Sequence, residues 1–340
     1  MKKGIALCFT TGLFILAFLI FAAPLPAAEK VQKLNFSDFY APANPFAKLV
    51  DEWCREVEKA TEGRVIITPY HSNILTPMNQ TYSSVVKGVA DVGQSLPSYS
   101  MGRFPLTEVL TLPLGSMSGK QASGMANAYF KKFHPKEFDD VKVLFLHASG
   151  PGIFHTRKVV SSFNEIKGLR FKVNAEIADI ARAVGAVPVV YAASETYDAL
   201  VKGVLDGALT TWDALKTFRY GEVLKTTLEN YGVAKATSFF WVMNKDKWNA
   251  ISKRDQAAIE KITEEIFEKQ AKAWEAADED GKKFGKEKGM VFVRSSKAEE
   301  AATAEKMKPI LGEYLKMTKE KGLPGADALK FCQDFIKQHP

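Results

Sequence analysis

The chain has 340 residues, of which 46% are hydrophobic and 25% are charged. This length can form two domains with separate cores, and the composition excludes a disordered chain or a multi-span membrane protein. The formal net charge is +7, but the basic residues are spread out and interleaved with acids, as in residues 282–288. That pattern indicates solvated helix faces, and we expect no nucleic-acid partner.

Residues 1–28 predict a secretory signal peptide. Lys2 and Lys3 precede an apolar run at residues 5–23, and small residues at 24–28 precede Glu29. Such a segment is removed on export, which would lower the net charge to +5. An uncleaved anchor is the alternative, because the run is nearly long enough to span a bilayer. Polar residues that follow at once, without a basic flank, favour cleavage.

The rest of the chain alternates strands with helices. This order predicts an α/β fold in which mixed sheets are flanked by helices. We expect strands at residues 33–37, 65–68, 89–93, 141–147, 169–173, 187–191, 204–210 and 291–293. We expect helices at residues 45–61, 82–86, 176–184, 194–201, 252–289, 297–321 and 326–338.

An internal repeat predicts two similar lobes. Residues 81–91 and 196–206 share seven of eleven positions at an offset of 115, and both follow the same order of strand, helix and strand. A pocket between two such lobes is the default binding site. Ligands of these sheets bind beyond the carboxyl ends of the strands, which here are Asn174 and residues 210–212.

Two apolar segments, at residues 141–152 and 236–244, predict two crossings between the lobes and hinge closure around a ligand. The predicted first lobe contains residues 29–148 and about 240–270. The predicted second lobe contains residues 149–239 and about 271–340. The helix expected from Ser252 would be roughly 50 Å long at 1.5 Å per residue, which is enough to brace both lobes.

Catalytic and metal motifs are missing from the sequence. It contains no GxSxG, HExxH or GxxxxGK[ST] pattern, and its five histidines lack metal spacing. We therefore expect no enzyme, no catalytic residue, no metal and no cofactor. Cys54 and Cys332 are expected to be buried thiols, with a disulfide as the alternative in an exported protein.

A strand with two cations on one face predicts an anion site. Arg170, Lys172 and Asn174 share one face of residues 169–174 by the period of two. Two cations on a buried strand are costly unless an anion meets them. The alternative is that Arg170 pairs with an acidic residue of its own lobe and that Lys172 extends to solvent.

Aromatic and hydroxyl side chains at the strand ends and crossings predict the walls of the same site. They would suit a ligand with an apolar or aromatic body, although core packing is the alternative for each aromatic ring. These candidates are Phe39, Tyr40, Ser95, Tyr99, Phe154, Thr210, Thr211, Trp212 and Phe240.

Several ordered motifs resemble one family across the mature chain. NEIKGLRFKVN, GAVPVVYAASETYDALVKGVLDGALTTW, KGVADVG, YSMGRFPLTEVLTLP and FFWVMNKDKW are similar to solute-binding proteins of tripartite ATP-independent periplasmic (TRAP) transporters, DctP type. The resemblance implies a type II-like, two-lobed periplasmic-binding-protein fold with a long bracing helix. It also implies delivery of an organic acid to a permease with a small and a large membrane subunit.

Two positions depart from the family pattern. Lys172 stands where the family usually has an arginine that binds the ligand carboxylate, and lysine lacks the planar fork of arginine. Arg170 could substitute for it. Thr210 stands where the family often has asparagine, while GALTTW is similar to a branch in which the tryptophan lines the pocket.

The sequence thus predicts a periplasmic receptor for a small carboxylate, with aromatic and α-keto acids as candidates. A secreted two-lobed α/β hydrolase or isomerase is one alternative, and a receptor coupled to a sensor kinase is another.

Overall fold

A computed structural model describes residues 31–100 and 102–339, so the predicted signal peptide lies outside the described residues. All the predicted strands and helices are present, some with shifted ends. The strands are β1 Gln32–Ser37, β2 Val65–Tyr70, β3 Val92–Ser95, β4 Val141–Ala148, β5 Ile153–Thr156, β6 Arg170–Val173, β7 Val187–Val190, β8 Gly207–Thr210, β9 Thr226–Glu229, β10 Ser238–Asn244 and β11 Val291–Arg294. The helices are α1 Pro45–Ala60, α2 Thr81–Val86, α3 Gly119–Phe133, α4 Ala178–Ala183, α5 Ala193–Val201, α6 Ala214–Thr217, α7 Lys245–Asn249, α8 Lys253–Glu287, α9 Lys297–Glu320 and α10 Gly325–Gln338.

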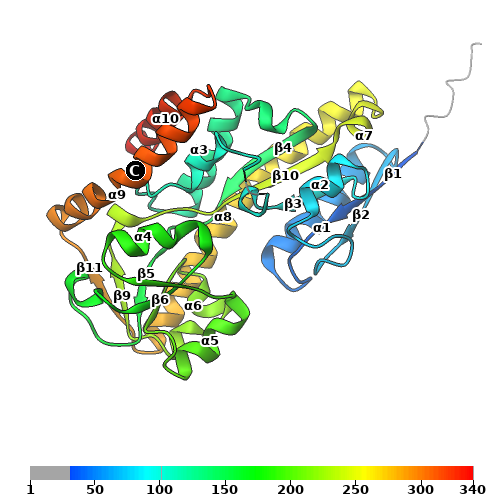
Figure 1. Cartoon of the computed structure of the whole chain (residues 1–340). Helices are drawn as coiled ribbons and strands as arrows, with labels where there is room; N and C mark the ends of the chain where they lie inside the picture. The colour runs from blue at the N-terminus through cyan, green and yellow to red at the C-terminus, as the bar shows by residue number, and fades with distance from the viewer. Residues whose placement is uncertain (1–30, 101, 340) are drawn as a thin grey trace, which may run out of the picture. The chain divides into compact units, whose positions relative to one another are not determined.

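The strands form two mixed sheets, which confirms the predicted fold class. The first sheet has the order β2-β1-β3-β10-β4, and the second has the order β11-β9-β5-β8-β6-β7 (Figure 1). Strand β10 is antiparallel to both of its neighbours, and β5 is antiparallel to β8 and β9. We call each sheet with the helices that pack on it the first and the second lobe.

The first lobe has an aromatic core under α1. Phe36 of β1 lies edge-on to Trp53 of α1 and to Trp241 of β10, with ring centroids 5.9 and 5.0 Å apart. Such large buried rings supply most of the apolar area that a core removes from water. The Trp53 indole also donates a hydrogen bond to Thr263 Oγ1 in α8, at 3.0 Å, which attaches the long helix to this lobe.

The repeated motif has the same structural role in both lobes. In the first lobe Asp91 Oδ2 accepts a hydrogen bond from the backbone N–H of Asn35, at 2.9 Å. In the second lobe Asp206 Oδ2 accepts one from the backbone N–H of Arg170, also at 2.9 Å. Each aspartate satisfies a backbone donor of the neighbouring parallel strand, within β1 in the first lobe and at the start of β6 in the second. Partly buried backbone groups need such partners.

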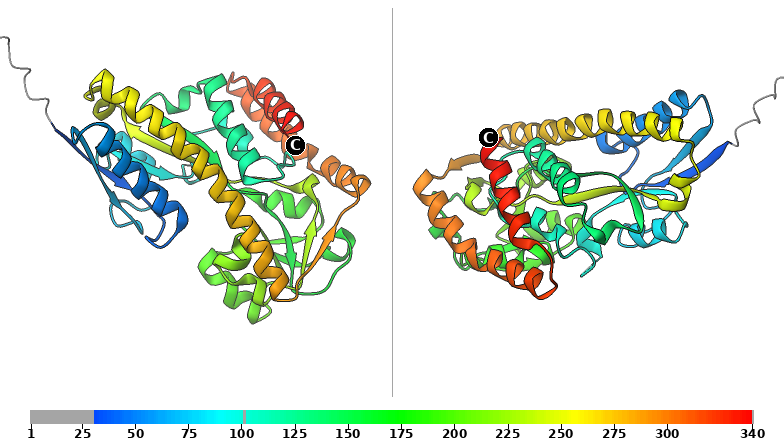
Figure 2. Two further views of the ribbon diagram at one scale, coloured as in Figure 1. Left: turned by 180° about the vertical axis from the view of Figure 1, so that it is seen from behind. Right: turned by 90° about the horizontal axis from the view of Figure 1, so that it is seen from above.

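Helix α8 contacts both lobes, as the sequence predicted. Ser252 caps it, accepting a hydrogen bond from the Asp255 N–H, and the helix then runs for 35 residues. It packs against α1 and α3 in the first lobe and against α6 in the second (Figure 2). Gly281 lies so close to the second lobe that an added Cβ would be 2.0 Å from the Trp212 carbonyl oxygen.

Two chain segments cross between the sheets and pair with each other. The segment after β4 leads to β5, and the segment before β10 returns to the first sheet. The Ser149 N–H donates to the Thr237 carbonyl at 2.9 Å, and the Gly152 N–H donates to the Lys235 carbonyl at 2.7 Å. The crossing segments therefore form one hydrogen-bonded connection between the lobes.

Candidate functional site

Lys172 is a buried cation without an acidic partner. It lies in β6, where its neighbours Phe171 and Val173 point into the core of the second lobe. Its side chain points to the other face and is only 5% exposed. Nζ donates to Asn174 Oδ1 at 2.8 Å, and within the described residues no carboxylate lies within ion-pair distance of it.

The charged form of Lys172 is less stable in this environment than it is in water. Burial lowers the pKa of Lys172 to about 8, and the positive charge of Lys235 adds to this effect, while Glu176 opposes it. A cation in such an environment is stabilised by any anion that reaches it. The arrangement is therefore suited to bind a carboxylate.

Lys235 is a second buried cation, and the sequence reasoning did not identify it. It lies on the crossing segment before β10 and is 4% exposed. Nζ donates to Thr237 Oγ1 at 2.9 Å, and burial lowers the pKa of Lys235 as well. One signal could have found it: a lone lysine in the otherwise apolar and small-residue stretch VAKATSFFWVM.

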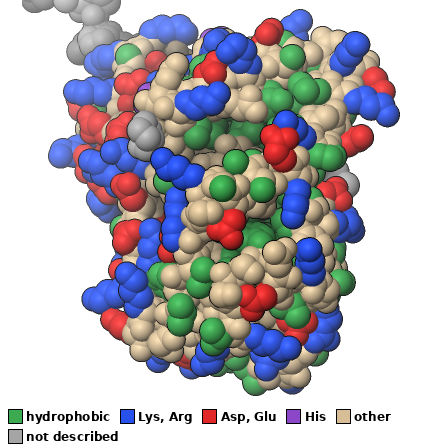
Figure 3. All heavy atoms as spheres, turned by 90° about the vertical axis from the view of Figure 1, so that its left-hand side faces the viewer, with side chains coloured by type: hydrophobic (Ala, Val, Ile, Leu, Met, Phe, Trp, Pro, Cys, Tyr) green, Lys and Arg blue, Asp and Glu red, His purple; other side chains and the backbone are tan. Residues whose placement is uncertain are grey.

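A hollow lies between the lobes, and neither lysine is among the residues that line it. Its volume is about 430 Å³, and it is lined by ten residues between Pro97 and Pro113 of the first lobe, by Glu176, Asp179 and Ile180 of the second, by Ser238, and by part of α9. Glu176 is close enough to both lysines to raise their pKa values. Hydrophobic side chains lie in hollows on the face drawn in Figure 3, between charged ones.

Partly exposed aromatic rings lie on the first-lobe side. Phe39 and Tyr40 follow β1 with ring centroids 4.0 Å apart, and Phe39 is stacked on Phe239 of β10 at 6.3 Å. Burial and the charges of Asp213 and Asp38 raise the pKa of Tyr40. Both rings pack against a buried cluster of Phe46, Leu96, Phe239 and Trp274.

An acid–histidine–acid bracket holds the aromatic loop. His71 contacts Asp38 Oδ2 through Nδ1 at 2.6 Å and Asp51 Oδ1 through Nε2 at 2.9 Å. The other Asp38 oxygen accepts from the Tyr40 N–H at 3.0 Å and from the Gln94 amide at 2.7 Å. Burial alone would lower the pKa of His71, but the two aspartates outweigh it and raise that pKa.

The structure separates the other cation of β6 from this site. Arg170 has a side chain that is 45% exposed and forms an ion pair with Asp206, with Nε 3.0 Å from Oδ2. Its Nη2 also donates to the Gly203 carbonyl at 2.7 Å. Of the two alternatives raised by the sequence, pairing within its own lobe is the one that the structure shows for Arg170.

Three predicted wall residues lie in cores instead. Trp212 is 1% exposed, packed beside Phe292 and under α8. Phe154 and Phe240 are fully buried in the cores of the second and the first lobe. Other side chains of their own lobes cover all three rings, as the core-packing alternative expects, and their contact with a ligand stays a prediction.

The remaining candidates are placed as follows. Tyr99 is 47% exposed, and burial together with Glu176 raises its pKa. Ser95 is buried and donates to the Met78 carbonyl at 2.7 Å. Thr210 and Thr211 are half-buried at the end of β8, where the Thr211 hydroxyl donates to Asp213. The structure thus brings Lys172 and Asn174 together, and Phe39 with Tyr40.

The buried histidines and cysteines offer little reactivity. Burial lowers the pKa of His147 to about 3 and that of His155 to about 4, so both rings are neutral at pH 7. Cys54 and Cys332 are buried free thiols, as predicted. Among residues 31–100 and 102–339, no group of three His, Cys, Asp or Glu residues could hold a metal ion.

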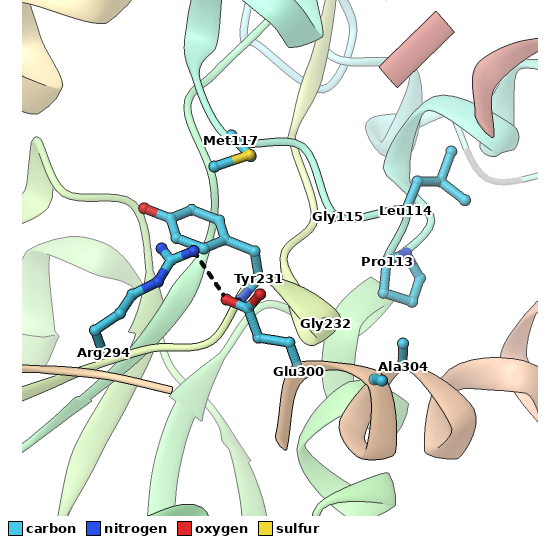
Figure 4. Close-up of a pocket in the computed structure, with 10 residues that line it drawn as sticks. Pro113, Leu114, Gly115, Met117, Tyr231, Gly232, Arg294, Glu300 and Ala304 are labelled. Atoms are coloured by element: carbon cyan, nitrogen blue, oxygen red, sulfur yellow. Dashed lines mark hydrogen bonds and ion pairs between the residues drawn. The ribbon is translucent and has the colours of Figure 1, made fainter. Parts of the chain in front are cut away.

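A further hollow, of about 310 Å³, differs from the lysine site in its charge balance. It lies where residues 113–117, Tyr231 and α9 meet (Figure 4). Arg294 forms an ion pair there with Glu300 at 3.1 Å and lies over the Tyr231 ring at 4.4 Å. The charges of Arg294 and Glu300 neutralise each other, so this hollow presents no unpaired cation to a ligand.

A two-lobed α/β chain with buried, unpaired cations and a hollow between its lobes has the features of a solute-binding protein. The family model for bacterial extracellular solute-binding protein, family 7, matches residues 36–317. The chain belongs to this family, whose members of known structure include periplasmic solute-binding proteins of TRAP transporters. No helix among the described residues is both long and apolar enough to cross a membrane.

Similar proteins cover nearly the whole chain. The outer membrane transporter protein TsaT of Comamonas testosteroni is 27% identical over 93% of this chain and 95% of its own. A TRAP periplasmic solute-binding protein of Desulfovibrio salexigens, in an open complex, is 27% identical with a TM-score of 0.85, covering 91% of this chain and 96% of that one. A TRAP protein of Bordetella bronchiseptica with bound (R)- and (S)-mandelate is 28% identical with a TM-score of 0.78, covering 91% and 99%.

Proposed function

We propose that this chain is the periplasmic receptor of a TRAP-type transporter and binds a small organic acid through Lys172. The observation that carries the proposal is a buried ammonium, 5% exposed, that no described carboxylate neutralises. A buried charge without a partner is strongly disfavoured, so an anionic ligand would supply what the fold lacks.

The ligand class is inferred from two aromatic rings of the first lobe and from one relative. Phe39 and Tyr40 present partly exposed rings, which suit an aromatic or other apolar body. The Bordetella bronchiseptica relative, 28% identical, holds mandelate, an aromatic acid. An aromatic carboxylate is therefore the ligand that we propose, with an α-keto acid as the second candidate.

Export and delivery complete the proposal. The signal-peptide pattern at residues 1–28 would send the chain to the periplasm. Closure of the lobes about the crossing segments would then present the ligand to a permease with a small and a large membrane subunit. Neighbouring genes for both subunits would support transport, whereas a neighbouring sensor-kinase gene would support signalling.

The first experiment is thermal-shift screening of the purified protein against organic acids, with mass spectrometry of any acid retained through purification. A ligand that binds only the folded state must raise the melting temperature. Binding of neutral sugars and of no acid would contradict the proposal. Conversion of a bound acid to a product would favour the secreted hydrolase or isomerase instead.

The second experiment compares two cations of the same strand. Lys172→Ala should weaken binding by about 1.5 to 3 kcal/mol, or roughly ten- to 150-fold, which is the worth of a hydrogen bond to a charged group. Arg170→Ala is the matched control, because Arg170 is already paired with Asp206. Equal losses in the two variants would remove Lys172 from its proposed role.

A further inference from the structure

The hollow between the lobes has charged side chains of one sign only. Within the described residues its lining includes the carboxylates Glu108 of the first lobe, Glu176 and Asp179 of the second, and Glu313 of α9, and it includes no lysine, arginine or histidine. Such charges repel an organic anion, so this hollow is unsuited to the carboxylate that we propose for Lys172. They attract a positively charged ligand instead.

Three of the four carboxylates have no ion-pair partner among residues 31–100 and 102–339. Asp179 is paired with Arg182, three residues further along α4, at 2.5 Å. Glu108, Glu176 and Glu313 take part in no salt bridge with a described residue. The hollow therefore has unpaired negative charges on both lobes and on α9.

The surroundings of two of these carboxylates favour an added cation. Burial and the charge of Glu137 raise the pKa of Glu108, which Lys321 opposes. Glu176 Oε1 accepts a hydrogen bond from Asn174 Nδ2 at 3.4 Å, but this donor is neutral. Because the charged form of a carboxylate is stabilised by an opposite charge nearby, a cation in the hollow would interact favourably with both groups.

A buried hydroxyl in the lining has no partner. Ser238 lines the hollow and is 2% exposed, and its Oγ forms no hydrogen bond with the described residues. Side chains alternate along a strand, so Ser238 points to the same side of β10 as Phe240. The Phe240 ring lies 6.4 Å from the ring of Phe104, which also lines the hollow. The hydroxyl is thus directed to the hollow, where a ligand could supply the partner that a buried polar group needs.

The other walls favour an organic cation over a metal ion. The volume of about 430 Å³ is in the range of small-molecule sites. Among residues 31–100 and 102–339, no three His, Cys, Asp or Glu side chains could hold a metal ion together, so a single ion cannot reach enough of the carboxylates. Several apolar side chains line the hollow and would contact the body of an organic ligand: Leu112, Ile180, Ile310 and Met317.

We propose that this hollow is a second binding site, separate from Lys172, and that it binds a primary ammonium compound with an apolar body. The ammonium donates to Ser238 Oγ in the field of the three unpaired carboxylates, and the body packs on the apolar walls. Because Glu108 and Glu176 belong to different lobes, the bound cation also offsets the repulsion between them. Lys172 does not line the hollow, so this binding is independent of the carboxylate site.

Ligand-observed NMR titration of the mature protein with 2-phenylethylammonium tests the proposal. The uncharged control is 2-phenylethanol, which has the same apolar body. The amine should bind saturably and at least about tenfold more tightly than the alcohol, as a hydrogen bond to a charged group implies. Its affinity should fall as sodium chloride is raised toward about 1 M, where charges are screened within about 3 Å. Lys172→Ala should leave the amine affinity within about twofold of wild type.

Five variants locate the cation. Glu108→Gln, Glu176→Gln and Glu313→Gln change exposed side chains and should fold normally. Each should weaken amine binding about two- to fivefold, as loss of an exposed ion pair implies, and the triple variant should weaken it at least about tenfold. Ser238→Ala should weaken it about three- to tenfold, as loss of one hydrogen bond implies. Glu195→Gln, an exposed carboxylate outside the hollow, is the matched control and should change nothing.

Ligand-free stability separates binding from structure at Ser238. Its hydroxyl has no partner to lose, so Ser238→Ala should keep or raise the thermal midpoint. A lowered midpoint with unchanged amine affinity would give the hydroxyl a structural role and overturn its assignment to a ligand.

Other outcomes would overturn the site as a whole. Equal affinity for the amine and the alcohol would do so, as would a triple variant within about twofold of wild type, or tighter binding of Ca²⁺ or Mg²⁺ than of the amine. Loss of amine binding in Lys172→Ala would place the amine in the carboxylate site and contradict a separate one. Failure of every organic acid to bind would instead contradict the receptor function and leave the ammonium site in place.

Discussion

The ligand-free protein should become more stable when Lys172 is replaced by methionine. Methionine has a similar length and no charge, so it can occupy the same space beside Asn174. Burial and the Lys235 charge, opposed in part by Glu176, lower the pKa of Lys172 from 10.5 to about 8. At 1.36 kcal/mol per pKa unit, the folded state at pH 7 carries about 3 kcal/mol of strain from keeping this lysine charged.

The sign of the pH dependence follows from linkage. A lysine whose pKa is lowered on folding binds fewer protons in the folded state between pH 8 and 10.5, so stability must rise with pH in that window. Below about pH 8 both states bind the proton, and the full destabilisation remains. Wild type should therefore gain stability between pH 8 and 10.5, and Lys172→Met should show a smaller gain.

Urea denaturation of both proteins at pH 7, 8, 9 and 10 measures the difference. The expected result is a variant about 3 kcal/mol more stable at pH 7, with the two curves converging toward pH 10. Subtracting the curves removes the titrating groups that do not interact with Lys172. A variant that is less stable than wild type at pH 7 would refute the reasoning, because it would show that the lysine contacts stabilise the fold.

Further predictions concern the helix brace and the aromatic loop. Gly281→Ala should destabilise the protein by roughly 1–3 kcal/mol or more, since its Cβ would meet the Trp212 carbonyl at 2.0 Å. Gly312→Ala, a helical position with nothing within 4 Å, should stabilise it by up to about 1 kcal/mol, and calorimetric melting of both variants checks the contrast. The two aspartates raise the pKa of His71, so the stability that protonated His71 contributes should be lost as the pH rises through that pKa. His71→Asn should abolish this pH dependence of the unfolding free energy, which urea titrations at pH 6–9 would measure.

Periodicity predicted the fold well because most of the elements are long or strongly patterned. Helix α8 has a serine cap and apolar positions at helical spacing, and it was expected within two residues of its observed ends. Helices α3, α6 and α7 and strands β5 and β9 were not predicted, and the run that forms β10 was expected only as a crossing between the lobes. Strand β5 is four residues long and buried throughout, so it offers no alternation that would distinguish it from the crossing loop.

The strand register, rather than the sequence repeat, resolves the choice between Arg170 and Lys172. Asp91 and Asp206 are equivalent by the repeat, and each accepts a hydrogen bond from a backbone N–H of a neighbouring strand. Asn35 in the first lobe and Arg170 in the second occupy equivalent positions, because each donates a backbone hydrogen bond to its aspartate. This equivalence indicates a structural role for Arg170. Lys172 corresponds instead to Ser37, one of the residues that lead into the aromatic loop.

The aromatic residues were harder to assign because both faces of the strands are covered. All seven residues of β10 are buried, so the sequence shows two neighbouring phenylalanines with no polar partner to mark a face. In the structure Phe239 joins Phe39 near the crossing segments, whereas Phe240 packs against Tyr82 in the core. Only the register of β10 against β3 and β4 decides which ring points where.

The buried lysines connect the stability of this protein to its proposed function. Keeping Lys172 charged in the ligand-free fold costs about 3 kcal/mol. A ligand present at 100 times its Kd stabilises a folded protein by about 2.7 kcal/mol, which is a similar amount. A carboxylate that acts as the missing counter-ion would therefore restore the stability that the empty site lacks. The same charges that weaken the empty protein would then make ligand binding and lobe closure favour each other.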